Sequence, residues 1–203
     1  MDTYIAIVDY GAGNLFSLKN ALDYIGARSA VTSDPAVLEK SAAVLLPGVG
    51  AFPDAMEKLN AAALTAPLRA AAQAKPFLGI CLGMQVLFET GTEFVQTPGL
   101  GLLPGRVVRL RAEGLPIPHM GWNSLRLHAD SPLLAGVDAG SYVYFVHSYR
   151  ADTAAGVVLA DAEDGEPVPA VVGRGQVFGC QFHPEKSGEA GLTILRNFWR
   201  MAK

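Results

Sequence analysis

The segment Phe77–Gln85, FLGICLGMQ, places a cysteine between two glycines at the end of an apolar run. The run from Pro76 to Ile80 predicts a buried strand, and residues 83–89 predict the helix that follows it and ends at Gly91. A Gly-x-Cys-x-Gly sequence between a strand and a helix permits a sharp turn, because glycines remove the side chains that would clash there. We therefore expect Cys81 to project as a nucleophile beyond the carboxyl end of its strand, with the helix N-terminus favouring the thiolate.

Around this segment, short apolar runs alternate with helical patterns. Strands are predicted at residues 4–8, 28–32 and 43–46, and helices at residues 15–25 and 54–73, the second interrupted at Pro67. After residue 95 the pattern changes to short strands and hairpins, and an amphipathic helix begins near Gly188. The sequence therefore predicts an α/β fold with a mostly parallel central sheet, flanking helices and antiparallel additions. We expect residues 1–203 to form a single domain.

Composition limits the possible functions. Half of the 203 residues are hydrophobic, 17% are charged and the formal net charge is −3, which favours a compact soluble protein and argues against a nucleic-acid binder. The two cysteines, Cys81 and Cys180, are too few for a disulfide framework, and no metal-ligand spacing is present, so we expect neither metal nor cofactor. The first residues, MDTYIAIVDYGAGN, do not resemble a signal peptide, and no run approaches the ~20 apolar residues of a membrane span. A cytoplasmic location is expected.

The downstream segment CQFHPEKSG supplies a base for the thiol. A cysteine that transfers acyl groups needs a base to accept and return its proton, and a third group to orient that base. Because Pro184 disfavours the α conformation at His183, we expect an extended segment in which His183 and Glu185 point to the same side. These two residues then complete a triad with Cys81. His119 and His147 either shape a cleft or simply pack, and Cys180 is expected to be an ordinary core residue.

Acyl transfer also needs donors for a developing oxyanion. PGVG, Pro47 to Gly50, follows the third predicted strand, and its glycines let backbone N–H groups approach a substrate. As a lone motif it predicts only a turn. Together with the cysteine turn it predicts an oxyanion strand, with the backbone of Leu82 as a second donor.

Together these motifs resemble a known family. GICLGMQ, with PGVG upstream and HPE downstream, is similar to the class I, triad-type glutamine amidotransferases. More narrowly, DYGAGNLFS, PGVGAF, HMGWN, YFVHSY and FHPEKSG resemble the glutaminase subunit of imidazole glycerol phosphate synthase, in order and spacing, from near the N-terminus to about residue 190. No catalytic position departs from the family's pattern.

The resemblance implies a role for each matching residue. Cys81 would form a glutamyl thioester, His183 would carry the proton and Glu185 would orient His183. The other implied sites are the oxyanion site, at Gly48, Val49 and Leu82; the glutamine contacts, at Gln85, Glu93 and the backbone of Ser148 and Tyr149; and the partner interface, at His119, Met120, Trp122, Asn123, Tyr144 and Lys186. Gln85 is the best supported of the glutamine contacts, since it lies one helical turn after Cys81.

The resemblance also implies a partner. The ammonia would pass to a (β/α)8-barrel cyclase subunit, which makes imidazole glycerol phosphate and aminoimidazole carboxamide ribotide in histidine biosynthesis, in a heterodimer. One alternative is a glutaminase subunit that serves another acceptor, as in pyridoxal phosphate synthase, but that type should lack HMGWN and HPEKSG together. Another is a catalytically silent regulatory homologue, which would lack Cys, His or Glu of the triad; all three are present here.

Overall fold

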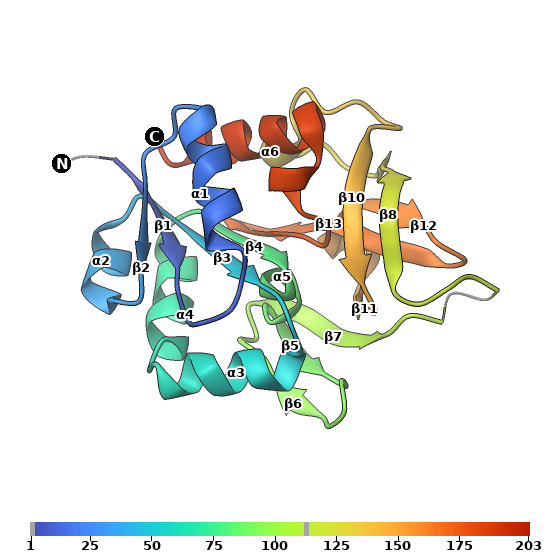
Figure 1. Ribbon diagram of the computed structural model, residues 1–203, viewed down its shortest axis with the longest axis horizontal. Helices are drawn as coiled ribbons and strands as arrows, with labels where there is room; N and C mark the ends of the chain where they lie inside the picture. Colours follow the sequence, from blue (N-terminus) through green and yellow to red (C-terminus); the bar gives the residue numbers. More distant parts are fainter. Residues whose placement is uncertain (1–2, 112–113) are drawn as a thin grey trace.

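The central feature of the computed structural model, which describes residues 3–111 and 114–203, is an eight-stranded sheet (Figure 1). Its strand order is β2-β1-β3-β4-β14-β13-β12-β9. The first five strands of that order run parallel, and β13, β12 and β9 extend the sheet antiparallel. The strands span Ile5–Val8 (β1), Ser29–Thr32 (β2), Ala43–Gly48 (β3), Phe77–Cys81 (β4), Arg126–Leu127 (β9), Val158–Glu163 (β12), Pro167–Arg174 (β13) and Val177–Cys180 (β14). This confirms the predicted mostly parallel sheet with antiparallel additions.

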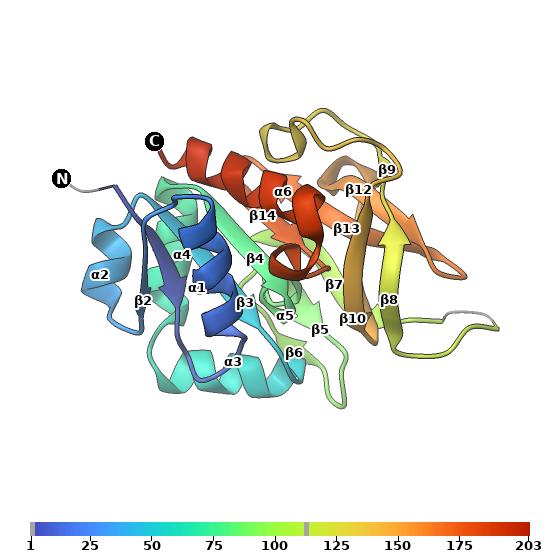
Figure 2. The ribbon, with the colours of Figure 1, turned by 45° about the horizontal axis from the view of Figure 1, so that its top comes forward.

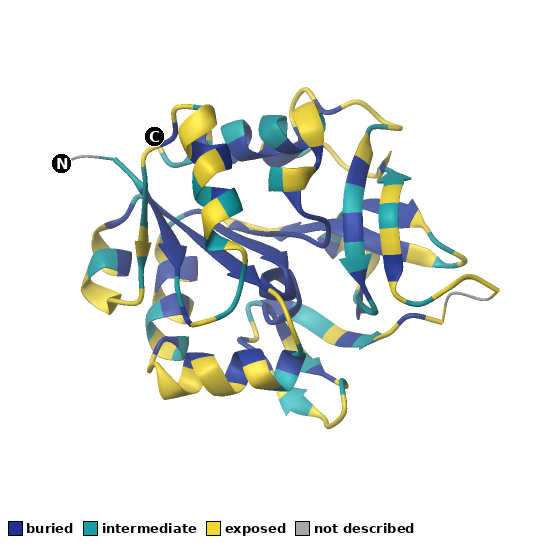
Figure 3. Cartoon of the chain, in the orientation of Figure 1, coloured by how far each residue is buried: buried dark blue, intermediate teal, exposed yellow. Residues whose placement is uncertain are grey.

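Helices cover both faces of the sheet, because its inner strands alternate side chains between two cores. In β1, Ile5 and Ile7 face the core under α1 (Leu15–Tyr24) and α6 (Gly188–Met201). Ala6 and Val8 face the opposite core, which also contains residues of α2 (Pro35–Lys40), α3 (Phe52–Ala61) and α4 (Thr65–Ala74). Figure 2 shows α1 and α6 lying over the sheet, and Figure 3 shows the buried strands between helices whose outer faces are exposed.

Two smaller sheets stand beside the central one. β5 (Phe88–Gly91), β6 (Thr97–Pro98), β7 (Leu103–Arg109) and β11 (Tyr149–Asp152) form a four-stranded sheet. β8 (His119–Ser124) and β10 (Tyr142–His147) form an antiparallel pair, visible at the right of Figure 1. The structure also contains short 3₁₀ turns: η1 (Pro132–Leu134), η2 (Ala155–Val157) and η3 (Pro184–Lys186).

The helical region predicted at 54–73 is broken earlier than expected. α3 ends at Ala61 and α4 begins at Thr65, and between them Ala63 adopts a left-handed φ of 54°. Pro67 lies inside the first turn of α4, where backbone N–H groups have no intrahelical acceptor and a proline therefore costs little. The prediction that Pro67 interrupts the helix was wrong.

The helix predicted after Cys81 is much shorter than expected. α5 spans only Leu82–Gln85, and the segment predicted to end it at Gly91 is strand β5. The carbonyl of Val86 accepts a hydrogen bond from the N–H of Leu100, at 2.7 Å, and that of Leu87 accepts one from Leu102, at 2.8 Å. These long-range bonds replace the helical ones, which explains why the apolar run leaves the helix after one turn.

Candidate active site

Cys81 occupies a strained turn between β4 and α5. Its φ of 55° and ψ of −114° lie outside the ordinary regions for a side-chain-bearing residue. The close packing around it explains the two glycines: a Cβ on Gly79 would lie 2.5 Å from the Gly83 carbonyl oxygen, and one on Gly83 would lie 1.8 Å from that of Leu46. The sharp turn inferred from the sequence is therefore present.

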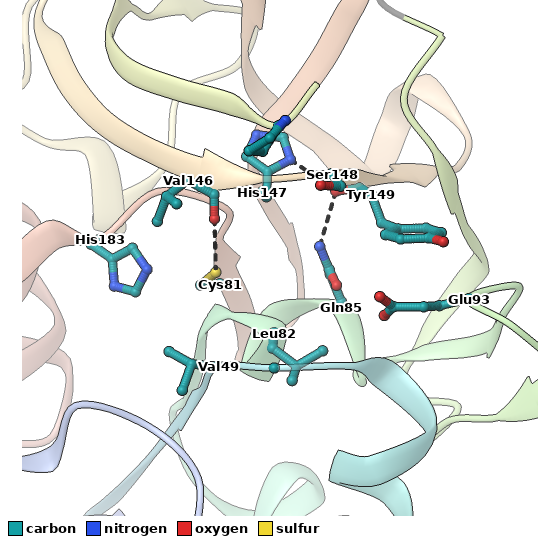
Figure 4. Close-up of a pocket in the computed structure, with 12 residues that line it drawn as sticks. Val49, Cys81, Leu82, Gln85, Glu93, Val146, His147, Ser148, Tyr149 and His183 are labelled. Carbon is teal, nitrogen blue, oxygen red and sulfur yellow. Dashed lines mark hydrogen bonds between the residues drawn. The ribbon is translucent and has the colours of Figure 1, made fainter. Parts of the chain in front are cut away.

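The turn opens into a pocket at the carboxyl edge of the parallel strands. Gly48 of β3 pairs with Cys81 on one side, and β14 lies on the other. The cavity measures about 370 Å³. It is lined by Val49, Gly50, Cys81, Leu82, Gln85, Glu93, Pro118, Val146, His147, Ser148, Tyr149 and His183, most of which Figure 4 labels.

His183 and Glu185 form a buried pair beside the thiol. The Nδ1 atom of His183 lies 2.8 Å from Oε1 of Glu185, and both side chains are almost fully buried. Burial lowers the pKa of His183, but the neighbouring Cys81 and Glu185 outweigh it and raise that pKa to about 9. His183 thus contacts the carboxylate of Glu185 and lines the same pocket as Cys81, which is the order that a Cys-His-Glu triad requires.

The backbone around this pair differs from the extended segment that we predicted. His183 itself is extended, with φ −95° and ψ 99°, but η3 begins at Pro184 and turns Glu185 back towards the imidazole. The turn is held by Ser187, whose hydroxyl donates to the carbonyl of His183 at 2.6 Å. The N–H of His183 donates to the carbonyl of Tyr144, at 3.0 Å, which ties the triad to β10.

The predicted glutamine contacts gather on the opposite side of the pocket. The Nε2 atom of Gln85 donates to the carbonyl of Tyr149, at 2.9 Å, and Oε2 of Glu93 accepts from the N–H of Phe52, at 2.8 Å. Ser148 and Tyr149 line the same cavity. Figure 4 shows the side chains of Gln85 and Glu93 projecting towards this side. The site therefore presents carboxylate and amide oxygens away from the thiol.

The predicted oxyanion residues also lie at the thiol. Val49 and Leu82 both line the pocket, and Gly48 precedes Val49 beside Cys81. Leu82 is the first residue of α5, where backbone N–H groups have no intrahelical acceptor. Gly50, with φ 104°, supplies the left-handed conformation that turns the chain away after Val49.

Two further residues at the site are Gln181, to which the sequence analysis assigned no role, and His147, which it expected either to shape a cleft or to pack in the core. Nε2 of Gln181 lies 3.9 Å from the Cys81 sulfur. His147 lines the pocket, and its Nδ1 atom lies 2.8 Å from the Tyr149 carbonyl oxygen. Burial lowers the pKa of His147 to about 3, so the ring is neutral and donates Nδ1–H to that oxygen. The position of Gln181 two residues before the base was the one available signal for it.

The predicted partner residues divide between the two faces of the β8–β10 pair. Met120 and Trp122 are 62% and 56% exposed. The Trp122 ring meets that of Tyr144 edge to face at 6.1 Å, and the Lys186 ammonium lies 6.0 Å from the Tyr144 ring centroid. We call Met120, Trp122, Tyr144 and Lys186 the aromatic face.

His119 and Asn123 do not belong to the aromatic face. Because side chains alternate along β8, His119 points inward, is buried, and stacks on Phe145. Asn123 donates to the carbonyl of Glu163, at 2.8 Å, and its amide nitrogen lies 3.2 Å from Nε2 of His119. The buried side chain of His119 therefore lies on the opposite face of β8 from Met120 and Trp122, and its place at the partner interface stays a prediction.

Comparison with known proteins first identifies the class. The family model described as "Glutamine amidotransferase class-I" matches residues 6–202, and the chain belongs to that family. Two solved structures share the fold at 22% sequence identity and a TM-score of 0.76. One, described as a glutamine amidotransferase, aligns over 97% of this chain and 98% of its own; the other, PurLQS from Thermotoga maritima, aligns over 100% of each chain.

Curated relatives narrow the family further. The imidazole glycerol phosphate synthase subunit HisH of Bacillus velezensis is 53% identical, over 98% of this chain and 96% of the relative. The HisH subunit of Bacillus cereus is 52% identical, over 96% of this chain and 93% of the relative. Within the class I glutamine amidotransferases, this chain belongs to the HisH family of imidazole glycerol phosphate synthase subunits.

Proposed function

We propose that this chain hydrolyses glutamine to glutamate and ammonia as the glutaminase subunit of imidazole glycerol phosphate synthase, with Cys81 as nucleophile. The observation that supports these roles best is the buried His183–Glu185 pair, 2.8 Å apart, whose imidazole lines the same pocket as the thiol at the strained turn. A cysteine in a pocket would not by itself support this function. The three groups together supply a nucleophile, a base and an orienting carboxylate.

The chemistry follows from this order of groups. Cys81 gives its proton to His183, and the thiolate attacks the side-chain carbonyl carbon of glutamine. His183 then protonates the departing nitrogen, so that ammonia leaves and a glutamyl thioester remains. Water, deprotonated by His183, attacks the thioester and releases glutamate, and His183 returns the proton to the departing thiolate. Glu185 stabilises the imidazolium at each stage.

The far side of the pocket fits the α-amino end of the substrate. Both N–H groups of Gln85 are used within the chain, by the Tyr149 carbonyl and by Oε1 of Gln181, so Gln85 offers its own oxygen to the cavity. Glu93 offers a carboxylate close by. We propose that these two acceptors, with the backbone of Ser148 and Tyr149, bind glutamine and favour its cationic α-ammonium group.

The backbone N–H groups of Val49 and Leu82 are proposed to bind the oxyanion. Both residues line the pocket beside Cys81, and Gly48 allows the close approach of β3. Removing one such donor from an acyl-transfer enzyme typically costs about 10²–10³ in rate. Val49 directly follows β3 and Leu82 directly follows β4, and these two strands are neighbours in the sheet.

The chain functions with a second subunit, as membership of the HisH family implies. We propose that this partner is a (β/α)8-barrel cyclase, that it docks on the aromatic face in a heterodimer, and that it receives the ammonia. We also propose that residues 1–203 form one glutaminase domain, which the family match over residues 6–202 supports. A cytoplasmic location is proposed as well, because Cys81 must stay reduced to act.

Covalent labelling by a glutamine-derived electrophile tests the proposed nucleophile. The reagent should label Cys81 and leave the fully buried Cys180 unmodified, as peptide mass spectrometry would show. Excess glutamine should protect Cys81, because the two compete for one pocket. Labelling of Cys180, or labelling of Cys81 that glutamine does not slow, would overturn the assignment.

A further inference from the structure

Gln181 is a fully buried polar residue at the reaction centre for which the triad has no role. It follows the last residue of β14, whose register with β4 pairs Cys180 with Ile80, so the next position stands beside Cys81. Its own N–H donates to the carbonyl of Ala170, at 2.9 Å, which fixes the backbone there. The sheet therefore holds this side chain against the nucleophile.

The neighbouring groups determine which way the Gln181 amide faces. The Tyr149 carbonyl can only accept, so the Gln85 atom 2.9 Å from it is the donor Nε2. The same nitrogen lies 3.0 Å from the amide of Gln181, and a donor there requires the oxygen Oε1. The nitrogen of Gln181 is thus left facing the sulfur of Cys81, at 3.9 Å.

We propose that Gln181 is a further catalytic residue, which donates Nε2–H to the Cys81 sulfur and stabilises its thiolate. The inference rests on the proposed role of Cys81 as nucleophile. The proton released from the thiol goes to His183, and the amide of Gln181 stays neutral throughout. No other reactant takes part in this step.

Val146 and Gln181 act on the sulfur in opposite ways. The Val146 carbonyl oxygen, 4.0 Å from the sulfur, can only accept, so it favours the protonated thiol. The N–H of Gln181 interacts best with a full negative charge, so it favours the thiolate. Because a thioester sulfur carries no such charge, Gln181 should help twice: when the thiolate forms, and when it leaves during hydrolysis of the thioester.

The test measures the ionisation of Cys81 directly. The rate of Cys81 alkylation by iodoacetamide is followed against pH in the full chain, with peptide mass spectrometry to locate the label. In Gln181→Met, which keeps the length and removes the donor, alkylation of Cys81 should be ~10-fold slower at a fixed pH on the rising part of the profile. Gln181→Glu, which replaces the donor by an acceptor, should slow it at least as much.

Gln176→Met is the matched control, because Gln176 is exposed at the opposite end of β14. It should leave the alkylation profile unchanged. If Gln181→Met also leaves the profile unchanged while the chain stays folded, Gln181 merely fills space and the proposal fails. Failure of the proposed nucleophile is a separate result, since glutamine turnover would then survive Cys81→Ala.

A measurement on the unsubstituted chain applies even if the Gln181 variants do not fold. The side-chain amide resonances of Gln181 should shift with the ionisation of Cys81, and this shift should disappear in Cys81→Ala. The proposal would be contradicted if the Gln181 resonances did not shift as Cys81 ionises, or if they shifted in the same way in Cys81→Ala.

Discussion

At the scale of single residues, the charge of His183 depends on its two neighbours. Burial alone would keep this imidazole neutral, but Cys81 and Glu185 raise its pKa from 6.5 to about 9. A folded-state pKa above the unfolded value means that the imidazolium stabilises the fold. That stabilisation is fully present below pH 6.5 and is lost as the pH rises through about 9.

We therefore predict that the pKa of His183, followed by NMR, falls in both Glu185→Gln and Cys81→Ala. The stability lost in Glu185→Gln, measured by urea unfolding, should be larger at pH 6 than at pH 10, because the imidazolium is present only at the lower pH. A His183 pKa near that of an exposed imidazole, or a stability difference independent of pH, would contradict this account.

Single residues also show where sequence reasoning stopped. Cys81 is recognisable from the two glycines beside it, and His183 and Glu185 are recognisable from the short segment around Pro184. The contacts of Gln181 are different: its partners Gln85 and Cys81 lie 96 and 100 positions away. No local sequence pattern indicates contacts between such distant residues. A glutamine that contacts the sulfur therefore cannot be told, from sequence, from one that is simply buried in the core.

At the scale of elements, the predicted strands were found because buried parallel strands are continuous apolar runs. The strand ends then brought residues near 48, 81 and 183 to one edge, as the sheet topology requires. The prediction of a longer helix after Cys81 was wrong for a related reason. An apolar run of this length fits a helix or a strand equally well. Backbone hydrogen bonds to residues 100–102 favour the strand, β5, in this fold.

The turn between β4 and α5 predicts a severe effect for one added methyl group. In Gly83→Ala the new Cβ would lie 1.8 Å from the Leu46 carbonyl oxygen, which is backbone and cannot rotate away. We expect a loss of about 3 kcal/mol or more in the free energy of unfolding. Urea denaturation gives the value.

Gly156→Ala is the control for this substitution, since a Cβ at Gly156 meets nothing within 4 Å. Its stability should change little. Equal stabilities of Gly83→Ala and the unsubstituted chain would mean that β3 and α5 are less closely packed than described here.

At the scale of the whole molecule, the aromatic face and the triad share backbone. Tyr144 contributes its ring to the aromatic face, and its carbonyl accepts the N–H of His183. A subunit docked on this face would therefore contact the same strand that holds the base. This arrangement allows docking to influence the triad, provided that the partner binds one arrangement of it better than another.

Loss of the exposed indole should weaken assembly. We predict that Trp122→Ala lowers the affinity for the cyclase subunit by ~30-fold or more, as is common for a central interface tryptophan. Titration calorimetry with the partner subunit measures this. Phe16→Ala, which removes a ring that is 77% exposed on α1, should bind normally. Equal affinities for the two variants would move the docking site away from the aromatic face.

Cys81 is proposed to release ammonia from glutamine for a reaction that another subunit carries out. The most direct test compares, in the assembled enzyme, cyclisation driven by glutamine with cyclisation driven by ammonium salts, for Cys81→Ala and the unsubstituted chain. We predict that Cys81→Ala abolishes the glutamine-driven reaction and leaves the ammonium-driven rate unchanged, because only the release of nitrogen needs the thiol. Glutamine-driven turnover that survives the substitution, or a parallel loss of both activities in a complex that still assembles, would contradict the account.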